Sequence, residues 1–170
     1  MYSMKYLILL FVALFYVVIV VVEKNYSLQY MANYANVPSI EFPKLDKAPV
    51  WGQYPEANLF KKHAIHFWAT WCPTCMADMP KLLEIIKNNS QVFFYLISIE
   101  SDRRVLKKII EQIKTPLANL CFIEGAPELA NRMNTYKFPE NHIFNERKEY
   151  EQKLIGSDIV SDKMINALLQ

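Results

Sequence analysis

The sequence predicts an α/β domain with a central mixed sheet and helices on both faces of that sheet, preceded by one N-terminal transmembrane helix. Three observations support this fold class. An unbroken apolar run lies near the N-terminus, strand-like and helix-like segments alternate through the middle of the chain, and a strand hairpin followed by an amphipathic helix closes it. Strands that alternate with helices normally pair in parallel, whereas a hairpin adds antiparallel strands, so the expected sheet is mixed.

The apolar run extends from Tyr6 to Val22 and has no polar face at helical spacing. A helix rises about 1.5 Å per residue, so this run spans about 25 Å, a little less than the ~30 Å hydrocarbon core of a bilayer. A cleaved signal peptide is the alternative, but the run lacks a small-residue cleavage pattern and exceeds the usual apolar core of such a peptide. Lys5 precedes the run, whereas Glu23 and Lys24 cancel after it, which predicts a cytoplasmic N-terminus and a domain across the membrane.

The expected organisation is a membrane anchor over residues 1–24, a juxtamembrane linker over residues 25–39 and one domain over residues 40–170. Beyond residue 24 the chain has 17 basic and 16 acidic residues, with no block of one sign. Proteins that bind nucleic acids normally carry a basic stripe on one face, so we exclude nucleic acid as a partner.

The domain should begin with a short edge strand at residues 40–45, IEFPKL, where apolar and polar side chains alternate. Residues 64–70, AIHFWAT, form the apolar run expected of a strand covered on both faces. From Cys72 to residues 88–90 the apolar side chains recur at helical spacing. Period and turn chemistry predict the remaining elements: a strand at 92–99, a helix capped by Ser101 and Asp102 that ends before Pro116, a strand at 120–124, a helix at 127–133, hairpin strands at 142–145 and 150–155, and a final helix at 157–169.

Two of the three cysteines, Cys72 and Cys75, stand three positions apart in WATWCPTCMADMP, residues 68–80. A zinc site needs three or four ligands, and only Cys121 and three histidines remain, so a metal site is weakly supported. Cys121 falls in an expected buried strand, where a free cysteine behaves as a small hydrophobe. A purely structural disulfide that closes so short a loop would constrain little of the unfolded chain. A redox role explains the context better.

Cys72 stands where a strand passes into a helix, so its sulfur faces unpaired N–H groups and the positive end of the helix dipole. Both favour the thiolate and should lower the pKa of this thiol below ~8.5. Pro73 suits the first helical turn because it has no N–H to leave unpaired. Cys75 lies on the same helix face one turn deeper, close enough for an intramolecular disulfide. Cys72 is therefore the expected nucleophile and Cys75 the resolving thiol.

The stretch FWATWCPTC, residues 67–75, resembles the thioredoxin superfamily, and in particular its membrane-anchored extracytoplasmic branch of TlpA, ResA and DsbE (CcmG) proteins. The resemblance covers about residues 40–170 and implies a thioredoxin-like fold. Pro80 matches the proline that kinks the family's first helix, and Pro139 stands where the family has its cis-proline, beside the cysteines. The resemblance implies a substrate-binding groove lined by Trp71, Pro73, Phe138, Pro139 and Glu140.

Two further residues are candidates for proton transfer. Asp78 lies six positions after Cys72, where this branch usually carries a glutamate, and a half-buried carboxyl there should have a raised pKa and act as an acid or base. A solvated helix residue is the alternative for Asp78. His66 lies six positions before Cys72, at the place of classical thioredoxin's buried acid, and is either a buried neutral histidine bonded to backbone or a proton relay. We expect His63 and His142 to be surface or strand residues without a role.

Sequence and resemblance together predict a thiol:disulfide oxidoreductase on the bacterial inner membrane, with its domain on the periplasmic or extracellular side. Its redox-active Cys72–Cys75 disulfide would need no further cofactor, and no metal is expected. The resemblance implies protein disulfides as substrates, apocytochrome c as a client, and re-reduction by a membrane thiol carrier of the DsbD or CcdA kind. The family's small residue near the cis-proline and its hairpin glycine are absent, which leaves partner recognition open. Three alternatives remain. One is an oxidant of the same fold, and another is a copper-handling module with His142 as third ligand. The third, a non-catalytic tether that uses the fold for protein contact, is disfavoured by the intact cysteine pair.

Overall fold

The computed structural model describes residues 11–25, 40–45, 49–55, 59–99, 103–112, 117–156 and 161–169. The chain divides into two compact units, Met1–Ser39 and Ile40–Gln170, and each is described by itself. In the first unit, residues 11–25 are helical and exposed. The described residues include no helix with both the length and the apolar character of a membrane span. Residues 1–10 of the expected anchor and residues 26–39 of the expected linker lie outside the described residues.

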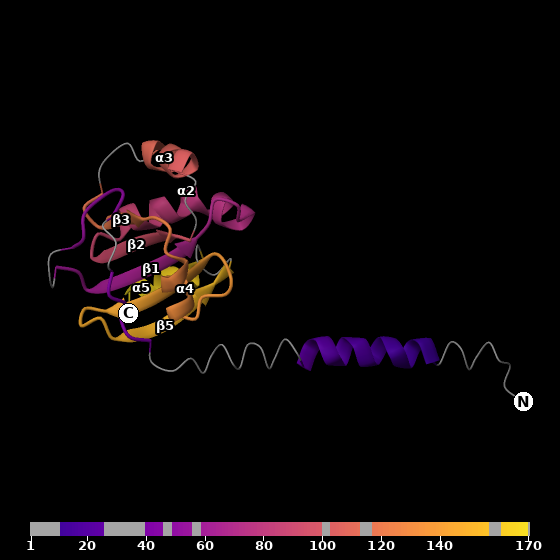
Figure 1. Cartoon of the computed structure of the whole chain (residues 1–170). Coiled ribbons are helices and arrows are strands. Elements are labelled where there is room, and N and C mark those ends of the chain that lie inside the picture. Colours follow the sequence, from indigo (N-terminus) through magenta and orange to yellow (C-terminus); the bar gives the residue numbers. More distant parts are fainter. Residues whose placement is uncertain are drawn as a thin grey trace, which may run out of the picture. The chain divides into compact units, whose positions relative to one another are not determined.

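The second unit is built on a five-stranded sheet in the order β3–β2–β1–β4–β5 (Figure 1). β1, β2 and β3 are parallel to one another, whereas β4 is antiparallel to both of its neighbours. The sheet is therefore mixed, as the sequence predicts. The elements are β1 (Lys62–Trp68), α2 (Pro73–Asn88), β2 (Val92–Ser98), α3 (Arg103–Gln112), β3 (Leu120–Ile123), α4 (Pro127–Arg132), β4 (Glu140–Asn145), β5 (Tyr150–Ile155) and α5 (Asp162–Leu169).

Different helices cover the two faces of the sheet. Successive side chains of a strand point to opposite faces, so neighbouring residues of one strand meet different helices. Ala64 and Trp68 of β1 pack into one apolar cluster with side chains of α2, α3 and α5, so this face is the α2 face. On the other face, the α4 face, Leu129 of α4 lies beside Ile123 of β3. Every residue of β1 and β2 is buried, which confirms that both strands are covered on both faces.

The expected edge strand at residues 40–45 is wrong, since this segment forms no strand. Pro43 has no N–H to donate to a sheet ladder. The segment is held instead through Phe42, whose ring packs edge-on against the rings of Tyr95 and Phe144, with centroids 5.7 Å and 5.0 Å away. Alternating polarity in a short segment therefore reflects aromatic packing here rather than strand pairing.

Both ends of α2 are fixed to the sheet. The helix follows β1 after a four-residue turn and runs through Pro80 to Asn88. At its far end the buried Asn119 amide donates hydrogen bonds of 3.0 to 3.1 Å to carbonyl oxygens of residues 86, 89 and 92. These bonds tie the end of α2 to the start of β2, so the N-terminus of α2 is held at the carboxyl end of β1. The expected cap of α3 at residues 101–102 and the first residues of the expected final helix, 157–160, lie outside the described residues.

Candidate active site

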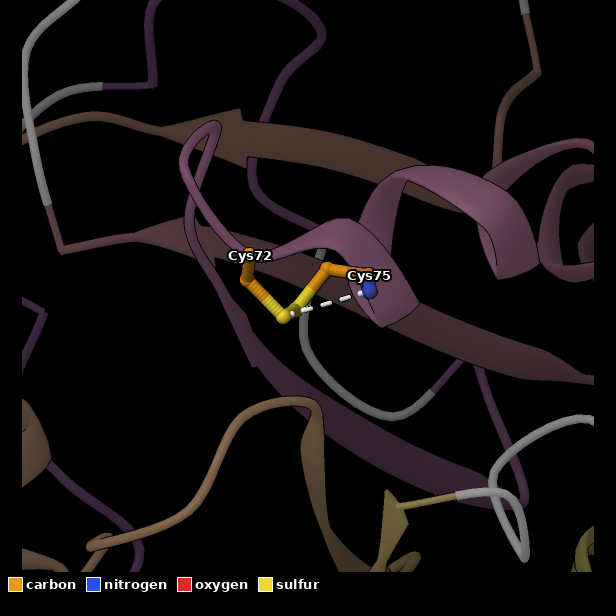
Figure 2. The surroundings of a disulfide bond; sticks show 2 residues. All are labelled: Cys72 and Cys75. Atoms are coloured by element: carbon orange, nitrogen blue, oxygen red, sulfur yellow. Dashed lines mark hydrogen bonds between the residues drawn. A yellow bond between two sulfur atoms is a disulfide. The ribbon is translucent and has the colours of Figure 1, made fainter.

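Cys72 and Cys75 form a disulfide at the start of α2, with their Cα atoms 5.3 Å apart (Figure 2). Cys72 is the N-cap residue of the helix and has an extended backbone. Its Sγ accepts a hydrogen bond from the backbone N–H of Cys75 at 3.2 Å. An N-cap side chain normally supplies an oxygen for this bond, whereas here a sulfur takes that place. The predicted helix start and the predicted disulfide are both confirmed.

The same position favours a thiolate at Cys72 once the disulfide is reduced. The first turn of α2 has no acidic residue that would oppose a negative charge. The unpaired N–H groups and the helix dipole attract such a charge. Cys72 is 5% exposed and Cys75 is 1% exposed, so Cys72 is the more accessible of the two. The geometry therefore suits Cys72 as the attacking sulfur and Cys75 as the inner, resolving one.

An aromatic rim, formed by Trp71 and Phe138, lies beside the disulfide. The two rings meet edge to face, with centroids 5.9 Å apart and planes at 89°. Trp71 is 59% exposed, whereas Phe138 packs against the apolar cluster that includes both cysteines. The Phe138–Pro139 peptide bond is cis, as the resemblance implies, and Pro139 is buried. Pro73 is exposed in the first turn of α2. Three of the five expected groove residues, Trp71, Pro73 and Phe138, are therefore exposed or partly exposed around the cysteines.

Asp78 lies on α2 one turn after Cys75 and is half-buried. Residues three apart on a helix share a face, so its carboxylate is on the same side of α2 as Cys75. Within the described part of the chain, its Oδ2 atom is buried and has no hydrogen-bond partner. A carboxylate oxygen that is withdrawn from water and unpaired is suited to accept a proton.

His66 is buried on β1, and its Nδ1 lies 2.9 Å from Oδ1 of Asn141 on β4. An amide oxygen can only accept, so we assign the proton to Nδ1, which leaves Nε2 as an acceptor. Burial lowers the pKa of His66 from 6.5 to about 4, and the hydrogen bond to Asn141 opposes this only in part. The expected buried, neutral histidine is confirmed, but its partner is a side chain rather than backbone.

The side chain of Glu140 is fully buried, which corrects the expectation that it lines the groove. Its Oε1 lies 3.0 Å from Nζ of Lys153 and 2.8 Å from Nε2 of His142. Asn141 pairs with His66 in the sheet and faces the same side, so its neighbour Glu140 points toward the α4 face. His63 and His142 lie in strands and are buried rather than on the surface.

The sequence reasoning missed Lys153 and Asn141. A signal for Lys153 was present in the predicted hairpin, because pairing its strands across the four-residue loop places Lys153 opposite His142, as observed. No comparable signal marked Asn141, whose role depends on the register between two strands far apart in the sequence.

No group of three or more His, Cys, Asp or Glu side chains that could hold a metal ion is found among the described residues. His142, the third ligand that the copper hypothesis needs, is fully buried beside Glu140. The copper hypothesis therefore gains no support from this residue.

No protein-family model matches the chain. Among curated proteins it is similar to sporulation thiol-disulfide oxidoreductase A of Bacillus subtilis, at 25% identity over 58% of this chain and 62% of the relative. It is also similar to the thiol:disulfide interchange protein DsbE of Pseudomonas aeruginosa, at 26% identity over 59% of this chain and 55% of the relative. The chain thus spans little more than half the length of these relatives.

Among solved structures, the domain resembles a thiol:disulfide interchange protein of the thioredoxin family from Chlorobium tepidum. The TM-score is 0.58 at 20% identity, and the likeness covers 79% of this chain and 99% of the other. This likeness shows the thioredoxin-like fold. The two curated relatives confirm the resemblance to DsbE-like proteins that the cysteine motif indicates.

Replacing His66 with Gln should flatten the pH dependence of stability. The pKa of a histidine is about 6.5 in the unfolded chain and that of His66 is about 4 in the folded one, so between these values only the unfolded state binds the proton. The stabilisation by neutral His66 is therefore present above pH ~6.5 and lost as the pH falls toward ~4, by about 3 kcal/mol. Urea unfolding of the oxidised protein between about pH 4 and 7 measures this change. Equal pH dependence in wild type and H66Q would contradict the assignment.

Proposed function

We propose that this protein is a thiol:disulfide oxidoreductase whose reduced form reduces the disulfides of client proteins. The observation that carries the proposal is the sulfur of Cys72 at the N-cap of α2, bonded to Cys75 and accepting the N–H of Cys75 at 3.2 Å. The curated relatives, named as a thiol-disulfide oxidoreductase and a thiol:disulfide interchange protein, support this activity.

The reaction begins when the Cys72 thiolate attacks one sulfur of a client disulfide. A Cys72–client disulfide forms, and the second client sulfur leaves as a thiolate that takes up a proton. Cys75 then loses its proton and attacks Cys72 Sγ, which releases the first client sulfur. The client gains two electrons and the protein ends with the Cys72–Cys75 disulfide of the present structure.

The resolving step needs a group that removes the proton of Cys75. Asp78 suits this role because its carboxylate lies on the same helix face and has a buried oxygen without a partner among the described residues. His66 is a second candidate relay, because its neutral ring keeps Nε2 as an acceptor when Nδ1 donates to Asn141.

We place the client beside the aromatic rim. Trp71 and Phe138 offer apolar surface next to Cys72, and the cis-Pro139 segment offers backbone groups for pairing with an extended client strand. Pro73 lies exposed at the start of α2 and borders the same region. Of Glu140, which follows Pro139, we expect only the backbone to border the client, because its side chain is buried.

The resemblance to the DsbE branch supports an oxidised Cys-x-x-Cys haem-attachment segment of apocytochrome c as the client. It also supports re-reduction by a membrane thiol carrier of the DsbD or CcdA kind. We further propose a single-pass anchor in the bacterial inner membrane, with the domain on the outer side. The apolar run Tyr6–Val22 supports this, and its described part is helical.

Replacing Cys75 with Ser should trap the client on Cys72, because the mixed disulfide can no longer be resolved. Reduced C75S protein is mixed with a synthetic oxidised Cys-x-x-Cys-His peptide, and the covalent adduct is measured by intact mass. We expect at least about tenfold more adduct than with wild type. C121S/C75S is the matched control, because Cys121 is buried, and it should trap equally well. Equal trapping by C72S/C75S would sink the assignment of Cys72.

The reduction potential decides between reductase and oxidant. The N-cap bond at Cys72 stabilises the thiolate, and stabilising the reduced form makes a protein more oxidising, so the oxidant hypothesis also has a structural basis. Because the resemblance to the DsbE branch implies a reductase, we expect a potential near the ~−270 mV of thioredoxin rather than the ~−120 mV of a strong oxidant. Equilibration of the full chain with dithiothreitol or glutathione buffers measures it, and a value near the oxidant end reverses the direction of electron flow.

The anchor is tested by placing charge within the apolar run. The double variant L14K/V18K should lose membrane retention, because each lysine at the centre of a span costs about 2.5 to 3.5 kcal/mol. Alkaline extraction of membranes measures retention, and E23Q, outside the run, serves as the control. A membrane-impermeant thiol reagent should label reduced Cys72 in spheroplasts. Extraction of the wild type into the soluble fraction, or labelling only after lysis, contradicts the proposed placement.

A further inference from the structure

We propose that the buried ion pair of Glu140 and Lys153 positions the loop that presents the cis-proline, which makes Lys153 a positioning residue for thiol exchange. We define the cis-proline loop as residues 134–139, between α4 and β4. The inference rests on the proposed function, because the position of this loop matters for activity only if clients dock beside Cys72.

The ion pair is enclosed by the protein. The side chain of Glu140 is 0% exposed and that of Lys153 is 6% exposed, with Oε1 and Nζ 3.0 Å apart. A buried charge that loses its partner is strongly unfavourable, so each group holds the other in place. His142 adds a third contact, with Nε2 2.8 Å from the same Oε1.

This cluster is connected to both ends of the cis-proline loop. Nζ of Lys153 donates to the backbone carbonyl of Asn134, the first loop residue, at 2.8 Å. Thr135 Oγ1 lies 2.9 Å from Nε2 of His142. At the other end, Glu140 directly follows Pro139 in the chain. One lysine therefore links the residue that opens the loop to the residue that follows it.

The backbone at Asn134 explains why such a link is needed. Asn134 has φ of 50°, in the left-handed region, which asparagine adopts more readily than most residues but which turns the chain sharply. Four residues later in the same loop, Phe138 meets Trp71 beside the cysteines. A change in the orientation of the Asn134 carbonyl would therefore move the aromatic rim.

The charges of the cluster balance without a contribution from His142. Burial lowers the pKa of His142, and the nearby Lys153 lowers it further, while Glu140 acts in the opposite direction. Burial and the charge of Glu140 raise the pKa of Tyr150, on the neighbouring strand, to about 12. Histidine and tyrosine are thus neutral near pH 7, and Lys153 is the cation that compensates Glu140.

Replacing Lys153 with Met removes the link while keeping a long apolar side chain. In the oxidised full chain, held in detergent, amide exchange of peptides that cover residues 134–139 should accelerate at least tenfold. With insulin as the disulfide client and excess dithiothreitol re-reducing the cysteines in each cycle, kcat/KM should fall about tenfold, mainly through KM. The rate at which dithiothreitol reduces the Cys72–Cys75 disulfide should stay within twofold, because this small reagent does not use the cis-proline loop.

K62M is the matched control. Lys62 also pairs with a glutamate, Glu151, at 2.6 Å and is largely buried, but it lies at the opposite end of β1 from Cys72. It should leave loop exchange and insulin kinetics within twofold of wild type.

If K153M does not fold, E140Q/K153M replaces it, because this variant leaves no buried unpaired charge and still lacks the bond to Asn134. Loop exchange should rise in it as well, whereas K153R should restore slow exchange.

Two results would overturn the inference. One is loop exchange in K153M, or in E140Q/K153M, within twofold of K62M. The other is a parallel loss of insulin and dithiothreitol reactivity, which would indicate damage to the cysteines rather than to client docking. Exchange is measured without a client, so it tests the loop even if wild-type protein fails to reduce insulin. That last outcome would count against the proposed function alone.

Discussion

The hydrogen bond from the Cys75 N–H to the Cys72 sulfur is the interaction on which the rest of the site depends. A helix start leaves N–H groups that need acceptors, and here the acceptor is the reactive atom itself. The bond forms only if Cys72 ends its extended segment where α2 begins, so the position of α2 on the sheet sets the chemistry. The buried strand β1 and the Asn119 amide at the far end of α2 hold the helix there.

β4 connects this site to the opposite face of the sheet. Asn141 points toward the α2 face and meets His66, whereas Glu140 and His142, on either side of it, point toward the α4 face. His66 and Asn141 are thus in contact on the α2 face, whereas Glu140 contacts His142 and Lys153 on the α4 face. Both sets belong to β4, which starts directly after the cis-proline.

The cysteine motif, the helix after it and the two buried strands were predictable, because each depends on a short run of residues with a clear period. Residues 40–45 were not, because three rings from distant segments decide how Phe42 packs. Glu140 was misplaced for a related reason. The family pattern locates the residue after the proline, but the direction of its side chain depends on strand register and on a lysine thirteen positions later.

A redox site that serves protein clients, as we propose for Cys72 and Cys75, faces conflicting requirements. The aromatic rim must remain open to the client, and Trp71 is accordingly 59% exposed. Few contacts on that side can therefore hold the rim in place. The cis-proline loop must nevertheless present its backbone in one conformation, because a mobile loop would lose entropy each time a client docks. Residues on the client side cannot support this loop without covering the surface where the client docks. The support must therefore come from the opposite face of the sheet. A buried ion pair suits that position because its geometry is narrow and breaking it is costly, so Lys153 can fix the loop without covering the surface that the client needs.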